Sequence, residues 1–146
     1  PDTGGTKRAN SYAKHLGVDM AICYKQRKVA NKIEHMTVIG DVRGKDVVII
    51  DDMCDTAGTL TKAASLMMEH GAESVRALCT HAVLSGPAYE RIAESVLTQF
   101  VVTDSIPLNK EKNTDKFKVL TVHELFAETL TCLVENRSIS DTLLIH

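Results

Sequence analysis

One segment constrains the fold of this chain more than any other: residues 47–60, with the sequence VVIIDDMCDTAGTL. Four consecutive β-branched residues, Val47 to Ile50, lack the alternation of a half-exposed strand. They therefore predict a central parallel strand that is covered on both faces. Asp51 and Asp52 would then emerge at the carboxyl end of this strand, which is where ligands bind in open α/β sheets.

The residues after the two acids have the composition of a tight turn that leads into a helix. Small side chains, two hydroxyl groups and a glycine allow the backbone to approach an anion closely. These residues are Asp55, Thr56, Ala57, Gly58 and Thr59. Apolar residues follow at helical spacing from Leu60 to Met67, and Gly71 marks a natural stop. Because the N–H groups and positive dipole end at the start of such a helix attract anions, the segment predicts a site for a phosphorylated sugar.

Two simpler interpretations exist for parts of this segment. In the first, Asp55 and Thr56 merely cap the following helix. We prefer this interpretation for either residue alone, but it does not explain the two acids and the turn together. In the second, Asp51 and Asp52 are the metal-binding acids of a nucleoside triphosphatase. That enzyme class needs a GxxxxGK[ST] loop, and the nearest candidate, residues 40–46, has the wrong spacing and no hydroxyl after its lysine.

Residues 47–60 resemble the phosphoribosyl pyrophosphate binding signature of type I phosphoribosyltransferases and ribose-phosphate pyrophosphokinases. In those proteins the two acids hold the ribose hydroxyls and the turn holds the 5-phosphate. The resemblance implies that Asp51, Asp52 and residues 55–59 bind ribose 5-phosphate. By itself, the signature does not separate enzymes that make phosphoribosyl pyrophosphate from those that consume it.

Residues 1–9, PDTGGTKRA, resemble the pyrophosphate loop of ribose-phosphate pyrophosphokinases, whose pattern is PDxGGxxRA. The resemblance implies a pyrophosphate loop formed by Asp2, Thr3, Gly4 and Gly5. The glycines would let backbone N–H groups approach a diphosphate, and we expect a helix just beyond them, over residues 6–16. Asp2 would lie beside a bound Mg²⁺, a cation that prefers oxygen ligands and substrate phosphates. Without the other motifs, an ordinary helix start after a glycine turn is the better interpretation.

Residues 24–31, YKQRKVAN, resemble the flexible catalytic loop of the same pyrophosphokinases, with its KxRxxAN pattern. The resemblance implies that Lys25 and Arg27 are catalytic and cover the transferring group. Diphosphoryl transfer builds negative charge between the substrates, and preorganised cations lower that barrier. Taken alone, a basic run is more often a solvated face. We expect residues 25–35 to form a loop or flap between short strands at 20–23 and 36–39.

Strands and helices alternate along the rest of the chain. We expect strands over residues 74–83, 100–103 and 117–122, and helices over residues 86–96 and around 125–133. This alternation predicts one α/β domain over residues 1–146 with a mainly parallel central sheet flanked by helices. The resemblance implies the fold of the type I phosphoribosyltransferases.

Composition excludes several other classes of protein. A formal net charge of −2 among 146 residues provides no basic field for nucleic acid. No apolar run approaches the ~20 residues that span a bilayer, so we expect no membrane partner. The four cysteines, never in a CxxC pair, predict reduced, mostly buried thiols of a cytoplasmic protein. They are Cys23, Cys54, Cys79 and Cys132.

The three motifs in this order resemble the carboxyl-terminal half of a ribose-phosphate pyrophosphokinase. The resemblance implies a transferase of nucleotide biosynthesis that converts ribose 5-phosphate and ATP to phosphoribosyl pyrophosphate and AMP. It also implies Mg²⁺ as cofactor and a homo-oligomer for the full-length protein. Because the chain opens on what looks like the loop after a missing strand, we expect the amino-terminal domain, and half of the ATP site, to be absent. The chain alone should then bind ribose 5-phosphate weakly and have little or no synthetase activity.

Two alternatives remain open at this point. A phosphoribosyltransferase would lack the KxR loop and carry a base-binding hood, and no hood is evident in the sequence. A non-catalytic synthetase-associated subunit would keep the fold for assembly or regulation. Intact Lys25, Arg27, Asp51 and Asp55 argue against a decayed site.

Overall fold

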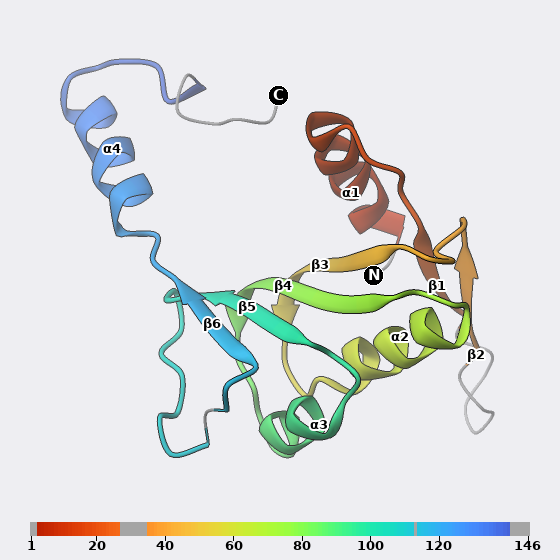
Figure 1. The fold of residues 1–146 in the computed structure, drawn as a ribbon. Coiled ribbons are helices and arrows are strands. Elements are labelled where there is room, and N and C mark those ends of the chain that lie inside the picture. The colour runs from red at the N-terminus through yellow and green to blue at the C-terminus, as the bar shows by residue number, and fades with distance from the viewer. Residues whose placement is uncertain (1–2, 27–34, 113, 141–146) are drawn as a thin grey trace.

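The computed structural model describes residues 3–26, 35–112 and 114–140. Its helices and strands alternate along most of the chain (Figure 1). The helices are α1 (Thr3–Leu16), α2 (Gly58–Glu69), α3 (Ala88–Glu94) and α4 (His123–Val134). The strands are β1 (Ile22–Gln26), β2 (His35–Ile39), β3 (Asp46–Cys54), β4 (Ser74–Ala82), β5 (Gln99–Thr103) and β6 (Phe117–Leu120).

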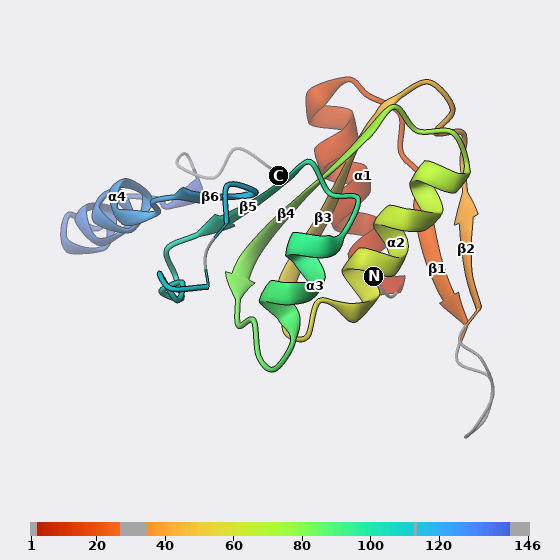
Figure 2. The same ribbon diagram turned by 60° about the horizontal axis from the view of Figure 1, so that its bottom comes forward.

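Four parallel strands form the main sheet in the order β3-β4-β5-β6. α2 connects β3 to β4, and α3 connects β4 to β5, so each of these strand pairs is a βαβ unit. Both helices lie on the same face of the sheet, as Figures 1 and 2 show from two directions. The predicted α/β class with a parallel sheet and flanking helices is confirmed.

The hydrophobic core lies between the sheet and these two helices. Leu60 of α2, Ile92 of α3, and Val75 and Phe100 of the strands are all buried there. The fully buried ring of Phe100 packs edge-on against Phe117, with ring centroids 5.6 Å apart. Full burial of one such side chain contributes about 1.5–3 kcal/mol. This layer therefore fixes α2 and α3 against the strands that carry the predicted acids.

β3 is an edge strand of the sheet within the described residues, so the prediction of a central strand covered on both faces is wrong. Val47 and Ile49 pack against the core, whereas Val48 on the opposite face is 48% exposed. A run of β-branched residues predicts strand structure locally. The number of neighbouring strands depends on segments that are distant in the sequence, and a local pattern does not contain that information.

β3 is also longer than predicted. It continues through Asp51 and Asp52 to Cys54, and Asp51 lies opposite Cys79 of β4. Pairing with β4 supplies backbone hydrogen-bond partners beyond the apolar run, which explains the extension. The two acids therefore lie in the last part of the strand rather than after it, still at its carboxyl end.

β1 and β2 form a separate antiparallel pair beside α2 (Figure 2). β2 confirms the strand predicted at residues 36–39. β1 starts and ends later than the predicted strand at 20–23, and it places Lys25 opposite Met36. Lys25 thus lies on a strand rather than in the predicted loop, because pairing with β2 extends β1 to Gln26.

α1 begins at Thr3, three residues before the predicted start at Thr6. Gly4 and Gly5 consequently lie in the first turn of the helix instead of in a loop. The first N–H groups of a helix need no intrahelical partner, and glycine adopts helical angles freely, so the glycine pair does not mark where the helix begins.

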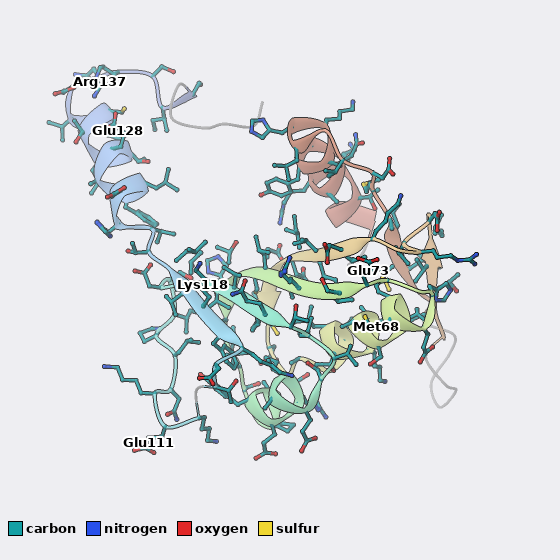
Figure 3. The ribbon with its side chains drawn as sticks, in the orientation of Figure 1. Met68, Glu73, Glu111, Lys118, Glu128 and Arg137 are labelled. Carbon is teal, nitrogen blue, oxygen red and sulfur yellow. The ribbon has the colours of Figure 1, made fainter. Side chains whose placement is uncertain are left out.

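α4 confirms the predicted final helix, but it projects from the sheet beyond β6 (Figure 1). Near its end, Arg137 pairs with Glu128 at 3.5 Å, and both residues lie far along this projection (Figure 3). Cys132 is buried, whereas most of the large apolar side chains of α4 are exposed in the described part of the chain. The exposed large side chains on α4 are Leu125, Phe126, Leu130, Leu133 and Val134.

Candidate functional site

The turn at residues 55–59, called the phosphate turn below, is held by the segment that follows β4. The N–H of Leu84 donates to the carbonyl oxygen of Cys54, with an N···O distance of 3.1 Å. The N–H of Ser85 donates to the carbonyl oxygen of Asp55 at 3.1 Å. The Ser85 hydroxyl also donates to the Asp55 carboxylate. The segment between β4 and α3 therefore fixes the backbone that leads into α2.

A further contact to the phosphate turn comes from α3. Nη1 of Arg91 donates to the carbonyl oxygen of Thr56 at 2.9 Å. The same guanidinium lies against Gly58, where an added Cβ would stand 3.3 Å from Nη1. With the two backbone bonds from the β4–α3 connection, three consecutive carbonyl groups are held by one neighbouring segment. Sequence analysis assigned no role to Ser85 or Arg91, and no local signal connects them to the turn.

Ala57 gives the phosphate turn an unusual backbone. Its φ is 58°, in the left-handed region that residues other than glycine rarely adopt, and its side chain is only 4% exposed. Within the described residues no side chain caps α2, and the Asp55 carboxylate accepts a hydrogen bond from Ser85 instead. The interpretation of Asp55 and Thr56 as mere capping residues is therefore not supported. Such strain persists only where the surroundings impose it, often at ligand sites.

The start of α2 has the chemistry to hold an anion. Its first N–H groups have no partner inside the helix, and the helix dipole places partial positive charge there. The side chains of Thr56 and Thr59 are exposed, and the Arg91 guanidinium lies beside Gly58. Backbone N–H groups and hydroxyls can together surround a phosphate group.

Asp51 and Asp52 are neighbours with opposite electrostatic environments. Burial raises the pKa of Asp51, which also accepts a hydrogen bond from the Asp52 N–H at 3.0 Å. Asp52 is exposed, and a hydrogen bond from Arg8 lowers its pKa. When ionised, both carboxylates can accept hydrogen bonds from sugar hydroxyls.

Arg8 joins the acids from α1, although sequence analysis assigned it no role. Its Nη1 lies 3.2 Å from Oδ2 of Asp52, with the two side chains 54% and 60% exposed. Such an exposed pair contributes about 0.2–1 kcal/mol. The available signal was its place as the arginine of the PDxGGxxRA pattern. The contact brings the first turns of α1 to the carboxyl end of β3.

For several other predicted site residues, the structure describes only the backbone or nothing at all. Asp2 and Arg27 lie outside the described residues, so their roles stay predictions. Lys25 lies on β1, with its side chain outside the described part of the chain. Thr3, Gly4 and Gly5 lie in the first turn of α1.

Two buried thiols lie close to the acids but are poor nucleophiles. Burial raises the pKa of Cys54 to about 12 and that of Cys79 to about 11. All four cysteines are free and buried, as predicted. At neutral pH these thiols stay protonated, so they contribute packing rather than chemistry.

Within residues 3–26, 35–112 and 114–140, no cluster of three or more metal-ligating side chains is present. No helix in the same ranges is both long and apolar enough to cross a membrane. Around the predicted site, the structure gathers the two acids of β3 with Arg8, and it places Arg91 beside the phosphate turn.

Comparison with known proteins gives consistent relatives. The family model described as the phosphoribosyl synthetase-associated domain matches residues 26–144. The chain is 54% identical over 140 residues to a ribose-phosphate pyrophosphokinase of Porphyromonas gingivalis, covering 96% of this chain and 44% of the relative. The corresponding enzyme of Campylobacter jejuni is 53% identical, with coverage of 96% and 45%.

A solved structure supports the same relationship. The phosphoribosylpyrophosphate synthetase of Mycobacterium smegmatis matches with a TM-score of 0.83 and 37% identity, over 93% of this chain and 44% of that one. The chain thus spans less than half the length of these relatives, and its predicted place in their carboxyl-terminal half stays a prediction. Given the family model that covers residues 26–144 and these relatives, the chain belongs to the ribose-phosphate pyrophosphokinase family.

Proposed function

We propose that this chain forms the ribose 5-phosphate-binding part of a ribose-phosphate pyrophosphokinase. In the reaction, the 1-hydroxyl oxygen of ribose 5-phosphate bonds to the β-phosphorus of ATP, the bond from that phosphorus to the AMP oxygen breaks, and the hydroxyl proton is released. The products are phosphoribosyl pyrophosphate and AMP. One observation supports the proposal: the acids of β3 and the start of α2 lie on one continuous segment that its neighbours hold in place.

Each part of this segment has a distinct proposed task. The N–H groups at the start of α2 and the hydroxyls of Thr56 and Thr59 bind the 5-phosphate. Asp51 and Asp52 accept hydrogen bonds from the ribose hydroxyls. Arg8 favours the ionised form of Asp52, because its hydrogen bond lowers the pKa of that carboxyl.

Mg²⁺ is the cofactor that we infer. Mg²⁺ usually binds through one or two carboxylates and completes its shell with water and substrate phosphates. The adjacent carboxylates of Asp51 and Asp52 fit this requirement, and a cluster of three protein ligands is not needed. Asp2, which lies outside the described residues, is the further proposed ligand. When bound, Mg²⁺ would supply positive charge to the phosphates of ATP.

Lys25 and Arg27 are the proposed catalytic cations. Their positive charge would stabilise the negative charge that develops during transfer. The chain spans 44% of its Porphyromonas gingivalis relative, so we infer that ATP binding and full activity, in a homo-oligomer, require segments beyond the matched part.

Ligand binding by the chain tests the ribose 5-phosphate proposal directly. We expect millimolar ribose 5-phosphate to shift the NMR signals of the amides in residues 55–60, and unphosphorylated ribose to shift them far less. The double variant D51N/D52N should bind at least tenfold more weakly, whereas D115N, the same type of substitution at one exposed loop residue, should bind as the wild type does. A folded wild-type chain that shows no shift at ~10 mM ribose 5-phosphate would exclude the proposal. This concentration lies about tenfold above the upper end of the typical range of KM values, about 1 μM–1 mM.

A second candidate is a non-catalytic synthetase-associated role, which the description of the matched family model favours. A chimera separates the two: this chain replaces the matched 140 residues in the Porphyromonas gingivalis enzyme. AMP formation by the chimera, with K25A depressing kcat more than it raises KM, supports the enzyme. A folded chimera that binds ribose 5-phosphate but forms no AMP supports the associated role.

A further inference from the structure

We propose that Arg91 is a positioning residue for the phosphate turn and sets its affinity for a phosphate group. The inference rests on the proposed ribose 5-phosphate site, and it adds a residue from another element, 35 positions from its partner Thr56. The ligand class it serves is a phosphomonoester, with inorganic phosphate as its simplest form.

The contact of Arg91 falls where the backbone reverses. Its Nη1 donates to the Thr56 carbonyl at 2.9 Å, and the next residue, Ala57, has the left-handed φ of 58°. A trans peptide group points its C=O and N–H in opposite directions, so this bond turns the Ala57 N–H away from α3. That N–H approaches the thiol of Cys54. Arg91 thus fixes the peptide plane immediately before α2 begins.

Arg91 stands on a helix that is itself firmly anchored. Ile92 beside it is fully buried in the core. At the carboxyl end of α3, directly after Arg91, Nζ of Lys116 donates to the carbonyl oxygens of Ile92, Ala93 and Ser95 at 3.2, 2.7 and 2.6 Å. The carbonyl groups at the end of a helix lack the full set of intrahelical partners, and the Ile92 carbonyl also accepts the Ser95 N–H at 3.2 Å. A cation at this end complements the helix dipole. The guanidinium is therefore presented by a rigid support.

The position of Gly58 matches the guanidinium. Any Cβ at residue 58 would come within 3.3 Å of Nη1 and 3.9 Å of Cζ of Arg91. Glycine therefore lets the planar cation lie against the first residue of α2. Arginine has five N–H donors, and the bond to Thr56 uses one of them, so its positive charge stays available beside the turn. A phosphate held at the start of α2 would gain from this charge as well as from the fixed backbone.

Titrations with ribose 5-phosphate and with inorganic phosphate, followed by NMR of the full chain, test the role of Arg91. We expect R91M, which removes donors and charge but keeps a similar shape, to bind both ligands at least tenfold more weakly. R91K, which keeps the charge, should recover part of that loss. R76M serves as the matched control, because Arg76 is exposed near the start of β4, and it should bind within twofold of the wild type. Melting temperatures should stay close in all folded variants.

A double-variant cycle separates positioning from an unrelated packing effect. G58A should also weaken binding, by less than R91M does, because its Cβ would stand 3.3 Å from Nη1 and shift the guanidinium by a few tenths of an ångström. If both changes act through the same contact, G58A/R91M should bind about as weakly as R91M alone. Independent losses, which multiply in the double variant, overturn the proposal, and so does an R91M affinity within twofold of the wild type.

Two further outcomes have a defined meaning: an R91M variant that does not fold, and a wild-type chain that binds neither ligand. Should R91M fail to fold, R91K decides the question, and wild-type affinity in R91K overturns the proposal. A wild-type chain that binds neither ligand contradicts the proposed ribose 5-phosphate function itself. Wild-type binding with unaffected Arg91 variants contradicts only the positioning role.

Discussion

The phosphate turn and the first turn of α1 have similar sequences but different structural support. Each combines small residues and glycine immediately before or within the start of a helix, and each was predicted to bind phosphate groups. The phosphate turn is held by Ser85 and Arg91, which lie 30 and 35 positions from their partners. The first turn of α1 is ordinary helix, and Arg8 of the next turn makes an exposed ion pair to Asp52. Preorganisation for an anion therefore depends on distant contacts rather than on glycine content.

The largest expected effect is that of A57V on stability. Ala57 combines a φ of 58° with a buried side chain, so a β-branched side chain meets both backbone strain and overpacking. We expect a loss of about 3 kcal/mol in the free energy of unfolding. Urea denaturation at 25 °C measures it.

The matched substitution in the other segment is G4A. Gly4 lies in the first turn of α1, where alanine suits helical angles better, so stability should rise by at most about 1 kcal/mol. Equal losses in A57V and G4A would contradict the view that the two glycine-containing segments differ in backbone support.

The next effect concerns the anchor of α3. K116M removes three hydrogen bonds from a charged donor to the end of this helix, and we expect a loss of about 2 kcal/mol in unfolding free energy. The exposed Lys118, on the neighbouring strand β6, is the control (Figure 3), and K118M should change stability by less than about 0.5 kcal/mol. If K116M also weakens phosphate binding while the protein stays folded, the support of the phosphate turn extends through α3. If K116M has the same unfolding free energy as K118M, the Lys116 hydrogen bonds are dispensable for stability.

The third prediction concerns Asp51, whose pKa burial raises above the usual 3.8. As pH falls through this raised pKa, the carboxylate becomes protonated and loses an acceptor for the ribose hydroxyls. We expect ribose 5-phosphate affinity to fall in that window, and D51N to bind about tenfold more weakly at pH 7, or about 1.4 kcal/mol. Titrations of both proteins between pH 7 and 4 measure this. Protonation of the ligand phosphate acts on both alike, so a steeper loss in the wild type isolates Asp51.

Stability should respond to Asp51 in the opposite sense. A raised pKa in the folded state means that folding favours the protonated form of Asp51. The stabilising effect of the protonated Asp51 is present below pH 3.8 and is lost as pH rises through the raised pKa. D51N should therefore be at least as stable as the wild type at pH 7 by urea denaturation. A clear loss of stability would show that the ionised carboxylate has a structural role in the folded chain.

The sequence predicted those features that depend on neighbouring residues. The strand at Val47 to Ile50, the helix after Gly58 and the alternation of strands with helices all follow from periods of a few residues. The edge position of β3 and the bond from Arg91 to Thr56 depend on pairing across many residues, and no local pattern encodes them. For the same reason the apolar period around residues 125–133 predicted a helix without predicting that its large apolar side chains are exposed in the described residues.

The smallest expected effect comes from R8M, which removes the pair between α1 and Asp52. Both side chains are more than half exposed, so the loss at pH 7 should be about 0.2–1 kcal/mol. Arg8 lowers the pKa of Asp52, so its contribution is present above 3.8 and is lost as pH falls through the lowered value. Denaturation curves of R8M and wild type should therefore converge toward pH 2. The control is K7M, which changes a neighbouring exposed lysine on the same helix and should leave the pH dependence unchanged.

Hydrogen exchange adds the spatial test, because R8M should speed exchange of the α1 amides and leave those of α2 unaffected. Equal acceleration in both helices would mean that the ion pair supports the phosphate turn as well, and that the two segments are coupled through the acids of β3.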